Sequence, residues 1–386
     1  MQQHKERFLI ICLSRNGFGG LELQMVAKTK EWIERGHETL LIVHRHSPIH
    51  HHAIKTGVPH VAVSQRIEYV DPLTAWQISR VIRSFAPAAC LVGITRDLSI
   101  ALLARSFSII VKPRIMLFQQ MISGLKKRDF FHNWVYRNID GAIVPAEYMK
   151  TMLIESTIID PRKIEVIPYG IDVNTYRPAT AYERADARQL HGFTEHDFVC
   201  CIPARYDWLK NQKMCIEAMH RIATTSDNDA IILWCVGDPS DAPDSYYNNM
   251  KRLARDLGIE HRVRFSPFTN DFRSILYATD IYLMTSFAET FSLATVQALA
   301  SGVCSVATRA GGTVEQIHDG INGLLVQSDN SAELADTIIR LYDNPDLRKQ
   351  LAESAYIEAR VRYNADTVYE RVILRCLQGE IPTTTD

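Results

Sequence analysis

The sequence predicts an α/β protein made of two doubly wound parallel-sheet domains in series, followed by a helical tail. Short apolar runs alternate with helical patterns almost from end to end, which is typical of parallel strands covered on both faces by helices. The length of 386 residues is enough for two domains of about 100–200 residues each. Hydrophobic residues make up 46% and charged residues 23% of the chain, a balance that excludes collagen-like, disordered and small disulfide-scaffold proteins.

The first series of elements occupies roughly the first 170 residues. Each predicted strand is a short apolar run, and these runs lie at residues 8–13, 38–43, 90–93, 114–118, 142–145 and 165–167. Helical spacing covers residues 21–34 and stops at Gly36. The histidine-rich residues 44–52 follow a strand and include Pro48, so we expect an exposed loop with adventitious metal affinity and no native metal site.

The second series begins after a proline-containing segment, residues 168–178, that we expect to be a hinge. Its predicted strands lie at residues 198–202, 231–236, 263–265, 281–284, 303–307 and 323–326. Predicted helices lie at residues 211–224, 246–257 and 332–342, with one tail helix at 346–377. The predicted domains are residues 1–170 and 171–365, with residues 366–386 as a helix that packs back on the first domain. In such sheets, ligands bind beyond the carboxyl ends of the strands, so the cleft between the domains is the expected site.

Several classes of protein are disfavoured by what the chain lacks. No apolar run approaches the ~18–20 residues of a membrane-spanning helix. Residues 8–13 are followed by Arg15 without a cleavage pattern, which favours a strand over a signal peptide. The eight cysteines show no C-x-x-C spacing, which argues against zinc or redox sites and indicates a reducing compartment. We therefore expect a cytoplasmic protein.

The two halves of the chain carry opposite charge. Residues 1–178 contain 23 Lys and Arg against 15 Asp and Glu, a balance of +8, and the remainder contains 20 against 29, a balance of −9. A basic half suits an anionic membrane surface, a phospholipid or a phosphorylated substrate, although attraction between the two domains explains the asymmetry equally well. No nucleic-acid recognition module is visible, and we expect no nucleic-acid partner.

The first strand-end loop is rich in glycine. Gly17, Gly19 and Gly20 permit close approach of a ligand and lead into a helix N-terminus, which attracts phosphate. The G-x-G-x-x-G pattern of dinucleotide-binding folds is broken by Glu22, so NAD is not favoured. A plain tight turn is an equal alternative.

Two further strand-end loops carry charged residues. Arg205 and Lys210 follow the strand at 198–202 and are placed to clamp a diphosphate, unless they are merely solvated cations. Glu289 follows the strand at 281–284 and suits sugar hydroxyls, although a carboxylate stabilised by the helix dipole explains it too. The helix expected at 294–300 offers free N–H groups at its start, and Gln297 lies about two turns beyond Glu289 on a similar face. A glycine loop at 310–315 is expected to open one more helix.

Taken together, these motifs resemble the large GT4 family of retaining glycosyltransferases, which use nucleotide-sugar donors. The first loop and helix, residues 19–38, carry the family's R-G-H-E ending, and VIPYGIDVNTYRP (166–178) resembles its P-x-G-x-D signature. ARYDWLK (204–210) resembles the R-x-x-x-x-K phosphate pair, and residues 286–308 resemble E-G-F-G-L-x-x-x-E-A-x-A-x-G. AGGTVEQIHDGINGLLV (310–326) matches the run that follows.

The resemblance implies a GT-B fold and transfer of a sugar to a saccharide or lipid-linked acceptor, with retention and without a metal or cofactor. It implies roles in cell-surface polysaccharide, lipopolysaccharide or glycolipid biosynthesis. Arg205, Lys210 and Glu289 would be the catalytic residues, with the first two and the N–H groups of Phe291 and Ser292 stabilising the leaving diphosphate. The donor would contact Gly19, Gly20, Gln120, Thr290, Phe291, Ser292, Leu293 and Gln297.

The chain departs from the family pattern at two positions. Gln297 stands where the family has the second glutamate of E-x7-E, and Gln120 stands where many members have a histidine. These departures motivate an alternative, a nucleotide-sugar-binding homologue that has lost catalysis. A sugar-nucleotide epimerase on the same fold is another alternative, but no clear acid/base carboxylate set is found for it. A pyridoxal-dependent phosphorylase would be far longer than this chain.

The acceptor is expected on the basic first domain. Lys126, Lys127 and Arg128 precede several aromatic residues, among them Trp134. Cations beside amphipathic aromatics suit an anionic membrane or a lipid-linked glycan. A solvated helix start with core aromatics is an equal alternative. We expect the protein to lie in the cytoplasm, with peripheral contact at the inner face of the membrane.

Overall fold

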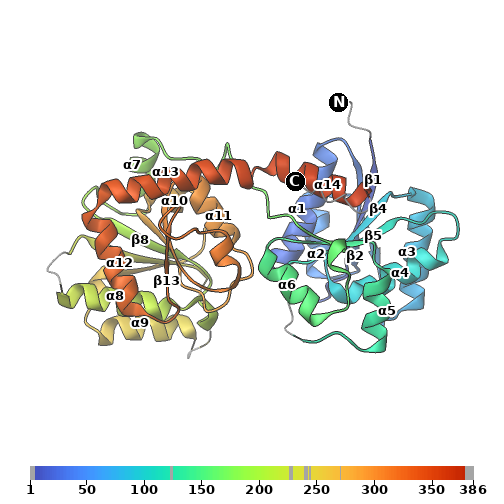
Figure 1. The fold of residues 1–386 in the computed structure, drawn as a ribbon, viewed down its shortest axis with the longest axis horizontal. Helices are drawn as coiled ribbons and strands as arrows, with labels where there is room; N and C mark the ends of the chain where they lie inside the picture. The colour runs from blue at the N-terminus through green and yellow to red at the C-terminus, as the bar shows by residue number, and fades with distance from the viewer. Residues whose placement is uncertain are drawn as a thin grey trace. The chain divides into compact units, whose positions relative to one another are not determined.

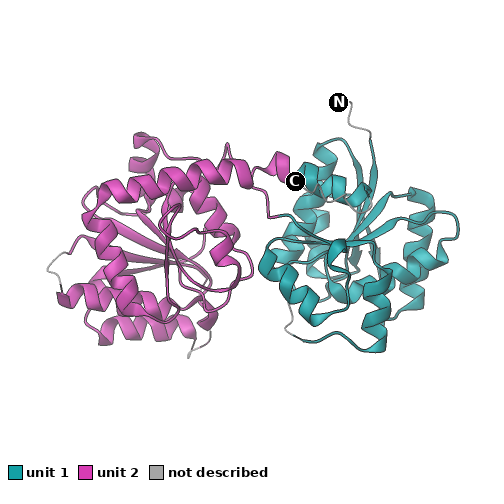
Figure 2. Ribbon diagram, in the orientation of Figure 1, with its two compact units in different colours: residues 1–167, 369–386 teal, residues 168–368 magenta. Residues whose placement is uncertain are grey.

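The computed structural model describes residues 5–121, 125–225, 229–238, 242, 245–269 and 271–378. The chain divides into two compact units, Met1–Ile167 with Tyr369–Asp386 and Pro168–Val368 (Figure 2). Each unit contains one parallel sheet with helices on both faces (Figure 1). The predicted fold class is confirmed.

Unit 1 contains a seven-stranded sheet in the order β3-β2-β1-β4-β5-β6-β7. Its strands are β1 (Arg7–Cys12), β2 (Glu38–His44), β3 (His60–Val63), β4 (Ala89–Val92), β5 (Arg114–Phe118), β6 (Gly141–Val144) and β7 (Ile164–Val166). Its helices are α1 (Gly20–Glu34), α2 (Pro48–Thr56), α3 (Pro72–Phe85), α4 (Leu98–Phe107), α5 (Phe130–Asn138), α6 (Glu147–Ser156) and most of α14 (Ala365–Leu377). The strand order reverses between β1 and β4, which both pair in parallel with their neighbours.

Two predictions for unit 1 are wrong. The strand β3 was not predicted, because its four residues lie between a proline and polar residues and show no clear period. Only residues 45–47 of the histidine-rich stretch form a turn, and residues 48–52 belong to helix α2 instead of the predicted loop. Pro48 occupies its first turn, where the missing N–H costs nothing, and the Ser47 side chain accepts a hydrogen bond from His50 N. The proline is therefore a helix start signal here.

Unit 2 contains a six-stranded sheet in the order β10-β9-β8-β11-β12-β13, again with parallel pairs. Its strands are β8 (Phe198–Pro203), β9 (Ile231–Val236), β10 (Val263–Ser266), β11 (Ile281–Met284), β12 (Cys304–Thr308) and β13 (Leu324–Val326). Its helices are α7 (Ala181–Leu190), α8 (Gln212–Thr225), α9 (Tyr246–Asp256), α10 (Phe272–Ala278), α11 (Leu293–Ala300), α12 (Ser331–Asp343) and α13 (Pro345–Arg362). The strand order reverses between β8 and β11, so the loops after these two strands start side by side.

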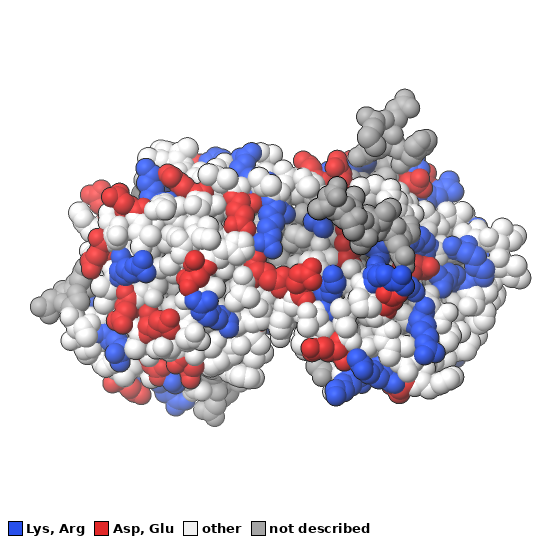
Figure 3. All heavy atoms as spheres, viewed as in Figure 1, with Lys and Arg blue, Asp and Glu red and all other residues white. Residues whose placement is uncertain are grey.

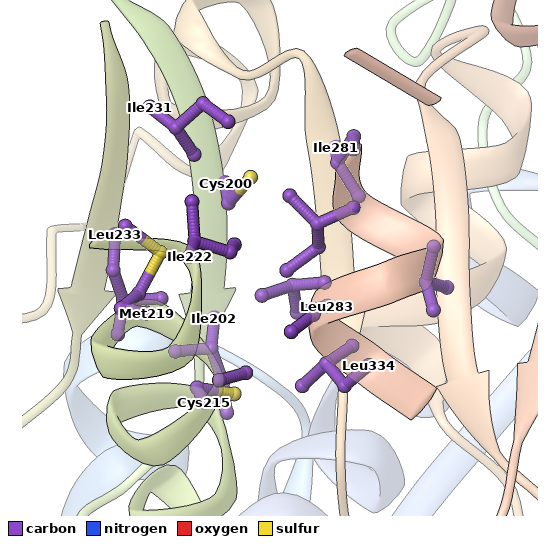
Figure 4. Close-up of a cluster of buried hydrophobic side chains, with 14 of the residues drawn as sticks. Cys200, Ile202, Cys215, Met219, Ile222, Ile231, Leu233, Ile281, Leu283 and Leu334 are labelled. Carbon is purple, nitrogen blue, oxygen red and sulfur yellow. The ribbon is translucent and has the colours of Figure 1, made fainter. Parts of the chain in front are cut away.

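The core of unit 2 lies between β8, β9 and β11 and the helices α8 and α12 (Figure 4). Cys200 and Ile202 of β8 face Cys215 and Met219 of α8, and all four are essentially buried. Burying a side chain of this size stabilises the fold by about 1.5–3 kcal/mol. All eight cysteines are buried free thiols, and burial raises their pKa, so they act as small apolar residues. This core fixes the ends of β8 and β11 from which the site loops leave.

The tail forms two helices, α13 and α14, instead of the single helix predicted. The break lies at Asn364, which pairs with Ile171 in an isolated parallel bridge. Ile171 N donates to Tyr363 O at 2.8 Å, and Ala365 N donates to Ile171 O at 2.9 Å. A Cβ on Gly170 would lie only 2.8 Å from Ala365 Cα, so the segment beside the break has no room for a side chain. These backbone bonds compete with continuation of the helix.

The end of α14 packs within unit 1. Arg375 is only 2% exposed, and its Nη2 donates to Lys163 O at 2.7 Å. The Arg35 guanidinium stacks over the Tyr369 ring at 4.3 Å. These contacts join α14 to the turn directly before β7 and to the residue that caps the end of α1.

Candidate functional site

A pocket of about 260 Å³ lies where the strand order of unit 2 reverses. Its lining includes Arg205 and Lys210 from the loop after β8, and Thr285 and Glu289 from the loop after β11. Doubly wound sheets bind ligands at such reversals, beyond the carboxyl ends of the strands. The three residues predicted to be catalytic therefore line one pocket.

The charges of this pocket are unevenly balanced. Lys210 Nζ and Glu289 Oε2 form an ion pair at 2.7 Å, with side chains 28% and 14% exposed. The Arg205 guanidinium is exposed and forms no hydrogen bond or ion pair within the described part of the chain. The pocket thus presents one neutralised cation and one available cation, which suits a ligand with at least one negative charge.

The Lys210 loop is held by the neighbouring strand-end loop. Thr285 Oγ1 donates to Lys210 O at 3.0 Å and to Asn211 O at 3.2 Å. Phe287 N donates to Leu209 O at 2.9 Å. Asn211 has φ of 52°, in the left-handed region that asparagine tolerates better than most residues. The lysine is therefore placed by backbone contacts between two loops 75 residues apart in sequence.

Two residues that the sequence did not single out contact the backbone of the Arg205 loop and fix its position. Gln212 is fully buried, and its Nε2 donates to Arg205 O at 2.9 Å. A Cβ on Gly237 would lie 2.2 Å from Ala204 O. The sequence indicates these two residues only weakly, because Gln212 is one polar residue at the start of α8 and Gly237 is a single glycine directly after β9.

The loop from Glu289 to α11 is fixed at both ends. Gly312 N donates to Glu289 O at 2.8 Å. Ser292 is the N-cap of α11, and its side chain accepts a hydrogen bond from Thr295 N. Ser292 N donates to the Gln316 side chain at 3.1 Å, so the Ser292 N–H predicted to face a phosphate already has a partner. The first N–H groups of α11 lie at Leu293 and Ala294, and helix geometry leaves such groups without a partner inside the helix.

Other predicted donor contacts have different surroundings. Phe291 is buried, and its ring packs edge-on against Tyr169 at 5.1 Å. Gln297 does not line the pocket, and its side chain hydrogen-bonds the Tyr176 hydroxyl. The prediction that Gln297 shares a helix face with Glu289 is wrong, because α11 begins only at Leu293. Thr290 and Leu293 are half-buried beside the loop, and residues 311–315 form a short 3-10 helix instead of an α-helix.

The remaining predicted donor contacts lie in unit 1. Gly19 is the N-cap of α1, and its N–H donates to Glu22 Oε2 at 2.9 Å. Glu22, which breaks the dinucleotide pattern, therefore completes the helix start. Gly20 begins α1, where a Cβ would meet only open space. Gln120 is 9% exposed, and its Nε2 lies 3.7 Å from Met25 Sδ.

Unit 1 also contains a buried acid that the sequence did not reveal. Asp97, just after β4, is fully buried and accepts a hydrogen bond from Leu13 N at 2.8 Å. Desolvation raises the pKa of Asp97 to about 7, and the Leu13 N–H and the neighbouring Arg96 only partly oppose that rise. This carboxyl therefore holds the residue that follows β1, shortly before the glycine-rich loop begins.

The predicted acceptor surface differs from expectation at Trp134. This side chain is partly buried against the core of unit 1, and its ring lies 6.2 Å from Phe131, so the core reading of this aromatic is correct. Lys127 Nζ donates to Thr95 Oγ1 at 2.9 Å, and burial lowers its pKa. Arg128 donates to Ile154 O at 3.1 Å, and Lys126 is exposed.

Other apolar side chains do reach the surface of unit 1. Phe130 is 91% exposed, Leu73 59% and Trp76 49%. The Tyr69 ring lies 6.2 Å from Phe131 and so connects the loop before α3 with α5. On the face shown in Figure 3, Lys and Arg side chains lie on both units, interspersed with Asp and Glu.

The described residues contain neither a metal-binding cluster nor a membrane-spanning helix. No cluster of three or more His, Cys, Asp or Glu within them is arranged to hold a metal ion. None of their helices combines the length and the apolar character that a membrane crossing requires.

Two family models match successive parts of the chain. "Glycosyltransferase Family 4" matches residues 18–175, and "Glycosyl transferases group 1" matches residues 183–358. A D-inositol 3-phosphate glycosyltransferase of Corynebacterium kroppenstedtii is 33% identical over 221 residues, which cover 56% of this chain and 49% of that protein. The chain spans about half the length of the curated relatives it matches.

Solved structures share the fold over nearly the whole chain. HepE of Anabaena, in complex with UDP, has a TM-score of 0.81 at 21% identity and covers 95% of this chain and 98% of its own. A glycosyltransferase of Rickettsia africae has a TM-score of 0.83 at 18% identity, with coverage of 96% and 98%. With both family models matched in order along one chain of this fold, the protein belongs to the GT4-type group 1 glycosyltransferases of GT-B fold.

Proposed function

We propose that this protein transfers a sugar from a nucleotide-sugar donor to a hydroxyl group of an acceptor. The observation that carries the proposal is the pocket of unit 2, where Arg205 lies beside the Lys210–Glu289 ion pair. A structural neighbour, HepE, has been solved with UDP and with UDP-glucose, which supports a donor of this kind.

The pocket suits the charge that develops when a diphosphate leaves the anomeric carbon. Arg205 offers a planar fork of donors, and Lys210 offers a compact point charge that its ion pair with Glu289 holds in place. Fixed donors of this sort stabilise a transition state because they need no reorganisation during the reaction. The Glu289 carboxylate, held by Lys210, accepts hydrogen bonds from sugar hydroxyls. We propose retention of configuration and no requirement for a metal or cofactor, on the basis of the family resemblance.

The acceptor is proposed to be a saccharide or a lipid-linked glycan. The curated relatives include enzymes named for D-inositol 3-phosphate, and the net positive charge of residues 1–178 suits a phosphorylated or membrane-bound acceptor. We place the protein in the cytoplasm, in peripheral contact with the anionic inner face of the membrane. Lys126, Phe130 and Trp76 are the exposed side chains that support this contact.

A ligand-stabilisation screen tests the donor. The melting temperature is measured with UDP, GDP, ADP and their sugar conjugates, with and without magnesium. A ligand at 100 times its Kd stabilises the folded state by about 2.7 kcal/mol, which for a chain of this size raises the Tm by several degrees. We expect one nucleotide to do so without magnesium.

The Arg205→Ala variant should lose that shift. Arg255→Ala serves as its control, because this exposed arginine lies on α9 with only a long ion pair to Glu260 at 3.8 Å. Product analysis with acceptors then follows. Conversion of the donor sugar without an acceptor would favour the epimerase, and binding without turnover on any acceptor would favour the inactive homologue. Absence of any shift would contradict the proposal.

A further inference from the structure

A buried glutamine lies directly behind the loop that joins Glu289 to α11. Gln316 is 0% exposed, and its amide makes both of its hydrogen bonds to one residue. Its Oε1 accepts from Ser292 N at 3.1 Å, and its Nε2 donates to Ser292 O at 2.9 Å. The side chain thus pairs with the backbone of Ser292 as a neighbouring strand would.

Gln316 is itself held in place. Asn322, 1% exposed, donates through Nδ2 to Gln316 O at 3.1 Å and to Glu358 Oε2 of α13 at 2.7 Å. The Asn322 side-chain oxygen accepts from His318 N at 2.7 Å. Together with the bond from Gly312 N to Glu289 O, the segment 311–322 therefore fixes both ends of the loop at 289–292.

The position of this loop decides what the pocket offers a ligand. Ser292 lines the pocket and caps α11, and its carbonyl also accepts from Val296 N at 3.2 Å. Without Gln316 the Ser292 carbonyl would keep a partner, but the Ser292 N–H would lose its partner. A buried donor without a partner is costly, so the loop would move until the N–H found one.

We propose that Gln316 is a positioning residue for the donor pocket. It fixes the loop from Glu289 to Ser292 and keeps the Ser292 N–H away from the ligand, so that the helix N–H groups meeting the diphosphate are those of Leu293 and Ala294. This inference rests on the proposed function, because it assigns the pocket to a nucleoside diphosphate.

The first test removes both hydrogen bonds at nearly constant volume. Gln316→Met should weaken binding of UDP, or of GDP or ADP if the screen selects one of these, by about tenfold, equivalent to about 1.4 kcal/mol. Asn330→Ala is the matched control. Asn330 caps α12 through Glu333 N, so its loss lowers the stability of the same unit but should leave the Kd unchanged. Unchanged binding by Gln316→Met would overturn the proposal.

A second variant gives a pH readout that a merely structural role would not produce. In Gln316→Glu, a protonated carboxyl can still accept from Ser292 N and donate to Ser292 O, but an ionised carboxylate cannot donate and adds a negative charge beside the diphosphate. The ratio of the variant's Kd to the wild-type Kd should therefore fall towards one as the pH is lowered from about 8 to about 5, where a buried carboxyl regains its proton. A ratio that does not change with pH would contradict the proposal that the two Gln316–Ser292 hydrogen bonds position the loop.

Amide hydrogen exchange separates failure of this proposal from failure of the proposed function. If the wild type binds no nucleotide, the donor assignment fails. Exchange in the free protein still shows whether Gln316 holds the loop at Ser292. The Ser292 amide should be protected in the wild type and should exchange at least about tenfold faster in Gln316→Met, in line with the loss of its one partner. Equal protection in both proteins would show that Gln316 does not hold the loop.

Discussion

Gly237 is the position where one added methyl group should disturb the pocket most directly. It follows β9 and donates its N–H to Ser266 O at 3.0 Å. In Gly237→Ala the new Cβ would lie 2.2 Å from Ala204 O, 3.0 Å from Ala204 C and 3.4 Å from Arg205 Cα. All three atoms belong to the backbone that carries Arg205, so no side-chain rotation can relieve the clash.

The required movement can be estimated from these distances. Contact between non-bonded heavy atoms is favourable at about 3.5 Å, so the Ala204 carbonyl must move by about 1 Å or more. Overpacking of this kind costs about 1–3 kcal/mol of stability. A displacement of about 1 Å in a positioning element can reduce catalysis by about a hundredfold. We therefore expect a folded variant with moderately lower stability and a much larger loss of nucleoside diphosphate binding.

The assay compares the Tm and the Kd for the nucleotide that the screen selects. Gly141→Ala is the control, because its Cβ would meet the ends of two long side chains of unit 1, Met116 at 2.6 Å and Arg375 at 3.0 Å, whereas Arg205 belongs to unit 2. It should lose some stability and keep its nucleotide affinity. If Gly237→Ala binds the nucleotide as tightly as the wild type, the placement of Arg205 by this close backbone contact is refuted.

Three further predictions concern charge and the surface. Lys210→Met should weaken nucleoside diphosphate binding by about 10–100-fold, measured by titration calorimetry, as expected for the loss of a charge-assisted hydrogen bond. The control Lys213→Met removes an exposed lysine paired with Glu217 and should leave the Kd unchanged. The native pKa of Asp97, about 7, lies above its ordinary value of 3.8, so the native state holds this proton more tightly and stability falls as the pH rises through about 4 to 7. Asp97→Asn should lose this dependence. In urea titrations at several pH values, the free energy of unfolding of the variant relative to the wild type should rise by up to about 4 kcal/mol across that window. Parallel pH profiles of the variant and the wild type would contradict this prediction. The wild type should sediment with anionic vesicles and be released by salt, and the double variant Trp76→Ser with Phe130→Ser should bind less because two exposed apolar rings are lost; equal binding to neutral and anionic vesicles would contradict this contact.

The order of strands and helices follows from the sequence because apolar runs of strand length are buried on both faces of each sheet. Where local signals compete, the prediction failed. In the tail, the backbone of Ile171 takes the hydrogen bonds that would continue the helix across Asn364. At Trp134, an aromatic next to a basic run looked like surface, but only the packing of α5 against the core decides which way it points.

The site could be predicted only in part, for a physical reason. Arg205, Lys210 and Glu289 are charged residues directly beyond predicted strands, so topology alone brings them together. The residues that hold them act through backbone atoms far away in sequence, as Thr285 and Gln316 do. Such contacts have no period and no fixed spacing. In the sequence, Gln316 is one polar residue among several in a short segment, between Glu315 and Ile317.

The packing of α14 against β7 and the residue before it has a consequence for biosynthesis. Arg375 and Lys163, joined by a hydrogen bond, are separated by 212 residues of chain, and the whole of unit 2 lies between them. A ribosome that has released the first seven strands has therefore made a sheet whose last helix does not yet exist. Native contacts over such separations form slowly, and chains longer than ~100–150 residues commonly populate partly folded intermediates. During synthesis, α14 can therefore pack on unit 1 only after the whole of unit 2 has left the ribosome.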